Sequence, residues 1–274
     1  MKKNLINLII LALVFTGACA FFSCESELFD TDTSVAVDNA IVEAIFADEQ
    51  NISDQASEGK LDTYIPGIES GILSQCATVT LDMTSTPKKI TVDFGTTNCT
   101  CADGRDRRGK IIVTFTGGYR DSGTVVTHSF EDYYVNDYQV TGTKVVVNAG
   151  KNTAGNWNYT IDIDAKIFKP TGDSIIWIST RNNEWIQGDS TVTWLDDVYL
   201  ITGSGNGVTA SGVAFDIEIT KALRKEIGYK HLTEGTIELT PAGKATRIID
   251  YGDGTQDNKA TVTIRNKTFN IILG

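Results

Sequence analysis

Between Tyr159 and Ile167 every second residue is apolar and the residues between them are polar or charged. Side chains alternate across a β-strand, so this pattern predicts a strand with one buried face and one solvated face. Similar runs recur from Cys76 to the C-terminus, and turn signals such as Gly117-Gly118, Asn136-Asp137 and the stretch Gly203–Gly207 separate them. We therefore expect a mainly β protein in which an antiparallel meander forms a sandwich or a curved sheet.

The segment before these strands has a helical period. Val37, Ile41, Ala44, Ile45 and Ile52 recur at helical spacing, with acidic residues between them. This predicts one N-terminal amphipathic helix over about residues 35–57, packed on the sheet. The helix and a connector rich in Gly and Ser then occupy residues 35–75, and residues 76–274 form a single antiparallel β domain.

Residues 1–23 have the three parts of a secretory signal peptide. Lys2 and Lys3 are basic, an apolar stretch follows, and small residues precede Cys24. An uncleaved membrane helix is disfavoured because acidic, polar sequence without a basic flank follows at once. Ser23-Cys24 resembles a bacterial lipoprotein signal, in which the cysteine sulfur receives a diacylglycerol. Cys19 is the rival acceptor, and we favour Cys24 because it closes the apolar run.

The sequence around Cys24 resembles lipoproteins of the Bacteroidota, in which an acidic run after the cysteine resembles a signal for the outer face of the outer membrane. Here the run is Glu25, Glu27, Asp30 and Asp32. The resemblance extends over nearly the whole mature chain, through Lys88–Gly95, Asp103–Lys110, Tyr133–Asn136, Gly142-Thr143-Lys144, Asp196–Gly203 and Asp250–Lys259. It implies an outer-membrane location and one domain, and no activity comes with it.

Charge argues against several partners. All 35 acidic residues follow Ser23, whereas two of the 24 basic residues precede it, so the net charge of the mature chain is −13. We therefore expect no nucleic-acid partner and no docking on anionic lipid by charge. Membrane attachment is expected through the N-terminal acyl chains, at about 0.8 kcal/mol per buried CH₂. Residues 24–34 are then a flexible acidic tether.

Three cysteines remain for the folded body, in an oxidising compartment where a disulfide is expected. Cys76 is predicted to pair with Cys99 or Cys101, and we take Cys99 as the partner. Cys99 and Cys101 are too close in sequence to pair readily with each other. A metal site built from these cysteines is disfavoured because neither histidine lies near them and the sulfur spacing is not that of zinc sites.

The sequence contains an internal echo. Val92-Asp93-Phe94-Gly95 matches Ile249-Asp250-Tyr251-Gly252, and the surrounding segments 79–114 and 237–263 share the plan of strand, aromatic-Gly turn, loop and strand. We predict that the two hairpins are related by pseudo-symmetry or lie side by side and close the sheet.

No catalytic residues, metal site or cofactor site can be assigned. The chain has two histidines, His128 in a strand, where we expect partial exposure, and His231 in a loop, and it lacks a Gly-x-Ser-x-Gly elbow. The strand carboxylates Glu131, Asp132 and Glu184 offer a glycosidase pair, an alternative we rank below binding. The turn from Asp250 to Asp257 resembles a calcium loop only faintly, because it lacks the glutamate of an EF-hand.

The sequence therefore predicts a lipid-anchored, non-enzymatic binding or structural protein at the outer membrane, whose ligand it does not identify. One alternative is a glycan-binding lipoprotein, since Trp177, Arg181 and Trp185 share one face of a predicted strand. The other is a carrier of lipids or other hydrophobic ligands, held on a concave sheet under the helix.

Overall fold

A computed structural model describes residues 30–61, 73, 76–191, 193 and 195–273. Within them the chain forms one helix and a single 14-stranded sheet, so the prediction of a mainly β fold with one N-terminal helix is confirmed. The elements are α2 (Ser34–Leu61), β1 (Thr78–Asp82), β2 (Lys88–Asp93), β3 (Cys99–Thr100), β4 (Asp106–Phe115), β5 (Val125–Val135), β6 (Tyr138–Lys151), β7 (Trp157–Phe168), β8 (Ser174–Gln187), β9 (Val198–Val208), β10 (Ala214–Glu226), β11 (Glu234–Pro241), β12 (Arg247–Asp253), β13 (Lys259–Ile264) and β14 (Lys267–Ile272).

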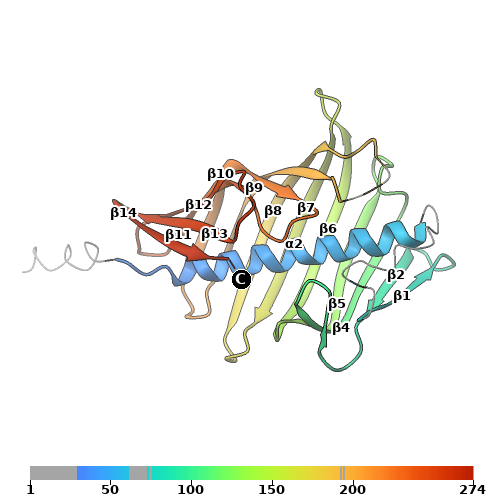
Figure 1. The fold of residues 1–274 in the computed structure, drawn as a ribbon, viewed down its shortest axis with the longest axis horizontal. Coiled ribbons are helices and arrows are strands. Elements are labelled where there is room, and N and C mark those ends of the chain that lie inside the picture. Colours follow the sequence, from blue (N-terminus) through green and yellow to red (C-terminus); the bar gives the residue numbers. More distant parts are fainter. Residues whose placement is uncertain (1–29, 62–72, 74–75, 192, 194, 274) are drawn as a thin grey trace, which may run out of the picture.

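The sheet is an antiparallel meander. Each strand pairs with its neighbours in sequence, except that β3 pairs only with β4 and lies off the main path. Of the two arrangements predicted, the structure has the curved sheet, because all strands stay in one sheet. Its concave face closes on α2, which lies across it, rather than on a second sheet (Figure 1).

The apolar faces of the strands supply the core. The alternation in β7 follows the sequence pattern, with Tyr159, Ile161, Ile163, Ala165 and Ile167 all buried on the concave side. These side chains belong to one continuous cluster that also contains the apolar residues of α2. The chain therefore folds around the interface between α2 and the concave face of the sheet.

Helix α2 is buried more completely than an amphipathic helix would be. Its apolar residues Val42, Phe46 and Ile52 are buried, but so are the acidic residues Asp48 and Glu49. An amphipathic helix would present such carboxylates to solvent. The helix therefore needs polar partners as well as apolar ones on the sheet.

The five residues Gly203–Gly207 lie inside β9, so the prediction of a turn there is wrong. The turn falls later, between Val208 and Ala214. On the concave face, Gly207 is paired with Trp177 on one side and Phe215 on the other. A Cβ on Gly207 would lie 2.1 Å from the backbone oxygen of Ile176 and 2.7 Å from Cζ of Phe215. Glycine is needed here because the β8 backbone and the Phe215 ring leave no space for a side chain.

The two echo hairpins have the same local conformation at their turns. The Asp93 carboxylate accepts the backbone N–H of Gly95 at 2.8 Å, and the Asp250 carboxylate accepts that of Gly252 at 2.9 Å. Both glycines have positive φ. The hairpins lie at opposite ends of the strand order and do not pair, so the expectation that they lie side by side and close the sheet is wrong.

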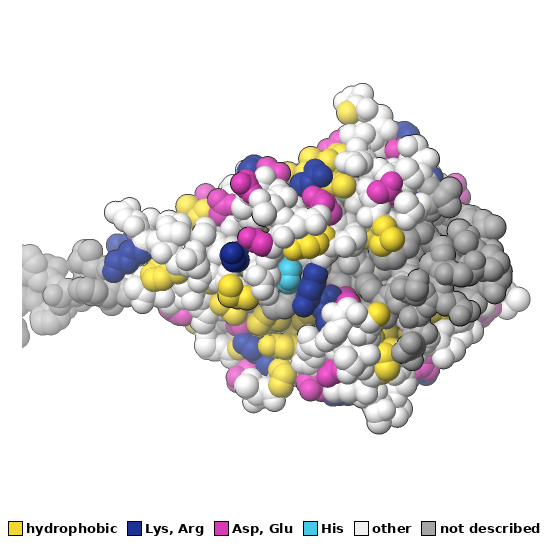
Figure 2. Space-filling view, in the orientation of Figure 1, with side chains coloured by type: hydrophobic (Ala, Val, Ile, Leu, Met, Phe, Trp, Pro, Cys, Tyr) yellow, Lys and Arg dark blue, Asp and Glu magenta, His cyan; other side chains and the backbone are white. Residues whose placement is uncertain are grey.

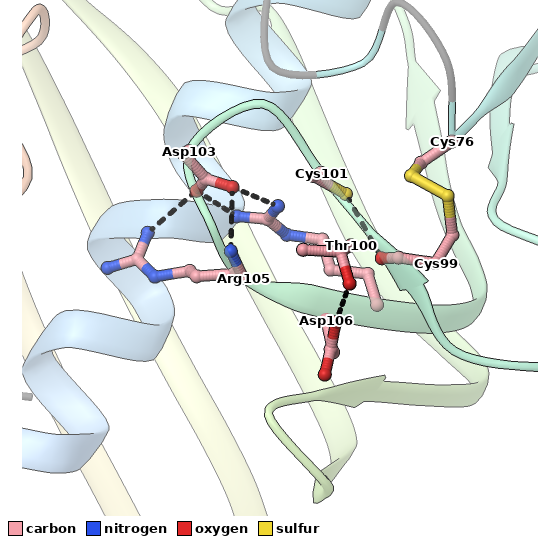
Figure 3. The surroundings of a disulfide bond; sticks show 8 residues. Cys76, Cys99, Thr100, Cys101, Asp103, Arg105 and Asp106 are labelled. Atoms are coloured by element: carbon pink, nitrogen blue, oxygen red, sulfur yellow. Dashed lines mark hydrogen bonds and ion pairs between the residues drawn. A yellow bond between two sulfur atoms is a disulfide. The ribbon is translucent and has the colours of Figure 1, made fainter.

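Cys76 and Cys99 form a disulfide, with their Cα atoms 5.5 Å apart (Figure 3). Cys101 is buried and carries a free thiol. The bond connects the segment before β1 to β3, at the edge of the sheet where the meander begins.

We predict that Gly207→Ala destabilises the protein by about 1–3 kcal/mol, the usual cost of overpacking. The added methyl group would collide with the β8 backbone and with Phe215. Asn206→Ala is the matched control, because Asn206 is exposed on the opposite face of the same strand. It should change stability by no more than about 0.5 kcal/mol. Urea unfolding measures both, and equal effects would contradict the packing argument.

Candidate functional site

Four carboxylates of α2 are paired with basic side chains of the strands and of the segments that connect them. The pairs are Asp38 with Lys169 at 2.6 Å, Glu43 with Arg181 at 2.6 Å, Asp48 with Arg105 at 2.5 Å and Arg107 at 2.6 Å, and Glu49 with Lys144 at 2.8 Å and His128 at 2.5 Å. At 3.6 residues per turn, Asp38, Glu43 and Asp48 project roughly 140° apart around the helix axis. The carboxylates therefore point to different sides of the helix. Each of them still has a basic partner, because the sheet curves around the helix.

Asp48 lies between two arginines, Arg105 in the segment that joins β3 to β4 and Arg107 near the start of β4. Arg107 is fully buried and also donates to Asp103, at 2.6 Å. Burial opposes the charge on Arg107, but the hydrogen bonds and charges of Asp103 and Asp48 outweigh it and raise its pKa. The same contacts hold the pKa of Asp103 below its ordinary value against its burial. This basic loop is thus a neutralised, structural part of the helix–sheet interface.

Glu49 is the most enclosed of the helix carboxylates. One oxygen contacts His128 Nδ1 and the Ser53 hydroxyl, and the other accepts from Lys144 Nζ. Burial alone would raise the pKa of Glu49, but the charges of His128 and Lys144 and their hydrogen bonds hold it well below its ordinary value. His128 is itself buried, so the prediction of a partly exposed strand histidine is wrong. The reason is that His128 lies on the concave face, opposite α2.

The segment before the helix is also held by the sheet. Arg247, at the start of β12, is fully buried, and its Nη2 lies 2.7 Å from one Asp30 oxygen and 2.8 Å from the other. Asp32 pairs with Lys244 at 2.8 Å, and this hydrogen bond is the main reason that the pKa of Asp32 is far below its ordinary value. Asp30 and Asp32 are therefore fixed to the body, contrary to the prediction that the whole segment 24–34 is a flexible tether.

A cavity of about 70 Å³ remains between α2 and the concave face. Its lining is mostly apolar and aromatic, with Phe46, Ile163, Trp177, Tyr199, Ile201, Ile227 and Leu232 among the lining residues. Lys144, Arg181 and Lys225 also line it, and all three are buried. The buried atoms Trp177 Nε1, Arg181 Nε and Asn183 Oδ1 belong to lining residues and have no hydrogen-bond partner within the described part of the chain. The cavity thus combines apolar walls with three basic groups, the carboxylate of Glu43 and polar atoms that lack a partner among the described residues.

Lys225 differs from the other two cations at the cavity. Lys144 and Arg181 each pair with a helix carboxylate, whereas among the described residues Lys225 has no ion pair and donates to the backbone oxygen of Tyr229. Burial lowers the pKa of Lys225 to about 8. Asp54 on α2 is half-buried by surface area, and its dense surroundings raise its pKa to about 7. Lys225 therefore loses its proton, and Asp54 gains one, closer to neutral pH than an exposed lysine or aspartate does.

The predicted ligand face is buried under the helix. Trp177, Arg181 and Trp185 do share the concave face of β8, as predicted, and all three are buried. Trp177 stacks on Phe46 of α2 with ring centroids 5.6 Å apart, and Trp185 stacks on Tyr199 at the same distance. Neither indole is therefore an exposed platform for stacking on a sugar. Trp177 and Arg181 instead belong to the cavity wall.

The other candidate groups are not brought together. Glu131 and Asp132 lie on β5 and Glu184 on β8, three strands away or roughly 14 Å at the usual strand spacing. Glu184 accepts hydrogen bonds from two asparagines instead. His231 is buried in the loop between β10 and β11, where burial and nearby cations lower its pKa to about 4.

The carboxylates in the turn Asp250–Asp257 accept hydrogen bonds from nearby backbone N–H groups. Asp250 accepts the N–H of Gly252, Asp253 that of Thr255, and Asp257 that of Lys259. Over the part of the chain that the structure describes, no group of three or more His, Cys, Asp or Glu side chains is placed to hold a metal ion.

Cys24 and Cys19 lie outside the described residues. In the part that is described, no helix has the length and apolar character needed to cross a bilayer. No family model matches the sequence, and neither curated proteins nor solved structures give a significant match. The site must therefore be interpreted from its own geometry.

We predict that Glu49→Gln destabilises the protein by about 3–5 kcal/mol, because it leaves Lys144 and His128 in a buried site without the carboxylate. The control is Asp93→Asn, which removes the partner of Lys110 in a pair where both side chains are more than a third exposed. It should cost no more than about 1 kcal/mol. Urea unfolding at pH 7 measures both changes, and a small effect of Glu49→Gln would contradict the buried-pair assignment.

The pH dependence separates charge from packing in the same variant. The pKa of Glu49 in the folded state is depressed below the ordinary value of 4.5, so its stabilisation is complete above pH 4.5 and is lost as the pH falls below it. The wild type should therefore lose more stability than Glu49→Gln between pH 5 and pH 3. Parallel curves would show that the effect of the variant is steric.

Proposed function

We propose that the chain is a lipid-anchored protein of the bacterial outer membrane that binds a small ligand and does not catalyse a reaction. The leader, Cys24 and the acidic residues after it support the anchor and the location, together with the resemblance to Bacteroidota lipoproteins. The binding activity is carried by one observation, the cavity between α2 and the concave face with Lys225 in its wall.

The cavity favours an anionic ligand. Lys225 is a buried cation without a carboxylate partner among the described residues, and a buried charge is stabilised by an opposite charge. The side chains around it, Tyr199, Ile201, Ile227 and Leu232, are aromatic or aliphatic. The matching ligand is an aliphatic monocarboxylate, with its carboxylate at Lys225 and its chain against these residues.

The lining also suggests the direction of the aliphatic chain. Lys225 pairs in the sheet with Tyr199, and Trp177 pairs with Gly207, eight residues farther along β9. At about 3.3 Å per residue this separation is roughly 26 Å between backbone positions. The lining residues are therefore spread along the strands, and we expect a slim chain to follow them better than a compact molecule.

A second candidate, a carrier of longer lipids, has the same apolar lining in its favour. Pockets that enclose a drug-sized ligand have volumes of about 300–1,000 Å³, and the cavity here is about 70 Å³. A long acyl chain would therefore need α2 to move away and to break its ion pairs with the sheet. Chain length thus distinguishes the two functions.

Metabolic labelling tests the anchor. Cells that express the full-length chain and grow with labelled palmitate should label the wild type and Cys19→Ser but not Cys24→Ser. Label that persists in Cys24→Ser and disappears in Cys19→Ser would move the site to Cys19. A wild type without label would overturn the proposal of a lipid anchor.

Calorimetric titration with a series from butyrate to decanoate tests the ligand, with the alcohols of equal length as neutral controls. We expect the carboxylates to bind at least tenfold more tightly than the alcohols, which corresponds to about 1.4 kcal/mol. Lys225→Met should remove this preference, whereas Lys230→Met, at a nearby exposed lysine, should retain it. Tightest binding of the short chains would support a small carboxylate as the ligand of the cavity. Tightest binding of decanoate would support the carrier of longer lipids. Equal binding of acids and alcohols would overturn the ligand class.

A further inference from the structure

The N-terminal segment is attached to one end of the body. Asp30 is bound to Arg247 and Asp32 to Lys244, both at the turn between β11 and β12. The carbonyl of Asp32 also accepts from Arg247 Nη2, at 3.2 Å. The direction in which the chain enters the body is therefore fixed by the sheet, at the end that carries the C-terminal hairpins (Figure 1).

The chain that joins this end to the membrane is short. Six residue steps separate Cys24 from Asp30, and a fully extended chain covers at most about 3.6 Å per step, or roughly 20 Å. Given the acylated Cys24 of the proposed function, the Asp30–Arg247 pair cannot lie farther than this from the lipid surface. The 20 Å reach is short compared with the helix, whose 28 residues extend about 42 Å.

We propose that the body is held on the membrane in one orientation, with the β11–β12 and β13–β14 turns facing the lipid surface. This inference rests on the proposed lipid anchor. Helix α2 then leads away from the membrane, and β1 and β2, at the other end of the long axis, are far from it (Figure 1). Gln50, in the cavity wall, is sixteen residues beyond Ser34, or about 24 Å along the helix.

The charges at the two ends of the C-terminal hairpins agree with this orientation. Residues 241–247 and 264–268, around the two turns, contain Lys244, Arg247, Arg265 and Lys267 and no acidic residue. The opposite turn, between β12 and β13, is flanked by Asp253 and Asp257. In a chain of net charge −13, the described part of this end has no excess of acidic over basic residues that lipid phosphates would repel, because Asp30 and Asp32 are matched by Arg247 and Lys244.

The face shown in Figure 2 bears interspersed basic, acidic and apolar side chains, without one broad basic area. It therefore offers no strong electrostatic contact with anionic lipid. The orientation is accordingly assigned to the short tether and its two ion pairs, and the basic turns are compatible with it.

Fluorescence quenching from the lipid headgroups tests the orientation. A dye is attached to Asn266→Cys in the β13–β14 turn or to Met83→Cys in the β1–β2 turn, both exposed positions, in the full-length acylated protein in vesicles that carry a headgroup quencher. The native thiol of Cys101 is buried, and unmodified protein measures its background. We expect at least threefold stronger quenching at residue 266 than at residue 83. Equal quenching, or stronger quenching at residue 83, would overturn the proposal.

A longer tether provides the second test. Insertion of about 20 Gly and Ser residues after Ser26 adds a root-mean-square reach of roughly 25 Å. It should bring the quenching at the two sites to within a factor of 1.5, because the body can then turn. A persistent difference would show that the surface itself docks and would overturn the role of the tether. Uptake of palmitate by each variant separates these results from failure of the anchor.

Discussion

The structure depends on the match between the carboxylates of α2 and the cations of the concave face. A charge that is buried without a partner costs several kcal/mol. The buried carboxylates of the helix and the buried cations of the sheet therefore each depend on the presence of the other. The apolar contacts of Phe46 and Ile52 add attraction without direction. The ion pairs of Glu43, Asp48 and Glu49 supply the direction, because each carboxylate meets one particular basic group. The helix is thereby fixed in its rotation and in its position along the sheet.

This arrangement also determines what the concave face can bind. The helix occupies most of the space that a curved sheet offers, and about 70 Å³ remains. Lys225 is distinctive in this setting, because its neighbours Lys144 and Arg181 are already paired with α2. A ligand carboxylate at Lys225 would extend the pattern of the interface, in which buried cations are paired with carboxylates. A larger ligand would have to displace α2. It would also have to supply partners for the basic groups that the helix carboxylates now neutralise.

The sequence predicted the strands well, because their signal is local. The alternation in β7 and the position of α2 could be recognised within a single segment. The glycines of β9 were misleading, since the groups that leave no space for a side chain there, the β8 backbone and the Phe215 ring, lie on neighbouring strands. Nothing in β9 alone distinguishes such a glycine from one in a turn. The prediction that Cys76 pairs with Cys99 or Cys101 is confirmed, because only these two cysteines were available, and the partner in the structure is Cys99, the one we favoured.

The candidate site could not be predicted in the same way. Glu49 and Lys144 are 95 residues apart, and Asp48 and Arg107 are 59 apart. Each of these residues, seen in its own segment, is an ordinary charged residue expected to face solvent. Their burial follows only from the curvature of the sheet, which places β4 and β6 on different sides of one helix. The acidic residues after Cys24 were likewise assigned to export alone, although Asp30 and Asp32 also hold the chain to β12.

The pairing of Asp30 with Arg247 spans 217 residues. Arg247 is therefore synthesised long after the helix, and α2 cannot take its final place until nearly the whole meander exists. Contacts between such distant segments form slowly, because the intervening chain loses conformational entropy before the contact contributes any stabilisation. Until then, the basic side chains of the concave face are not yet covered by α2. The last strands therefore complete the fold only when synthesis of the chain is nearly finished.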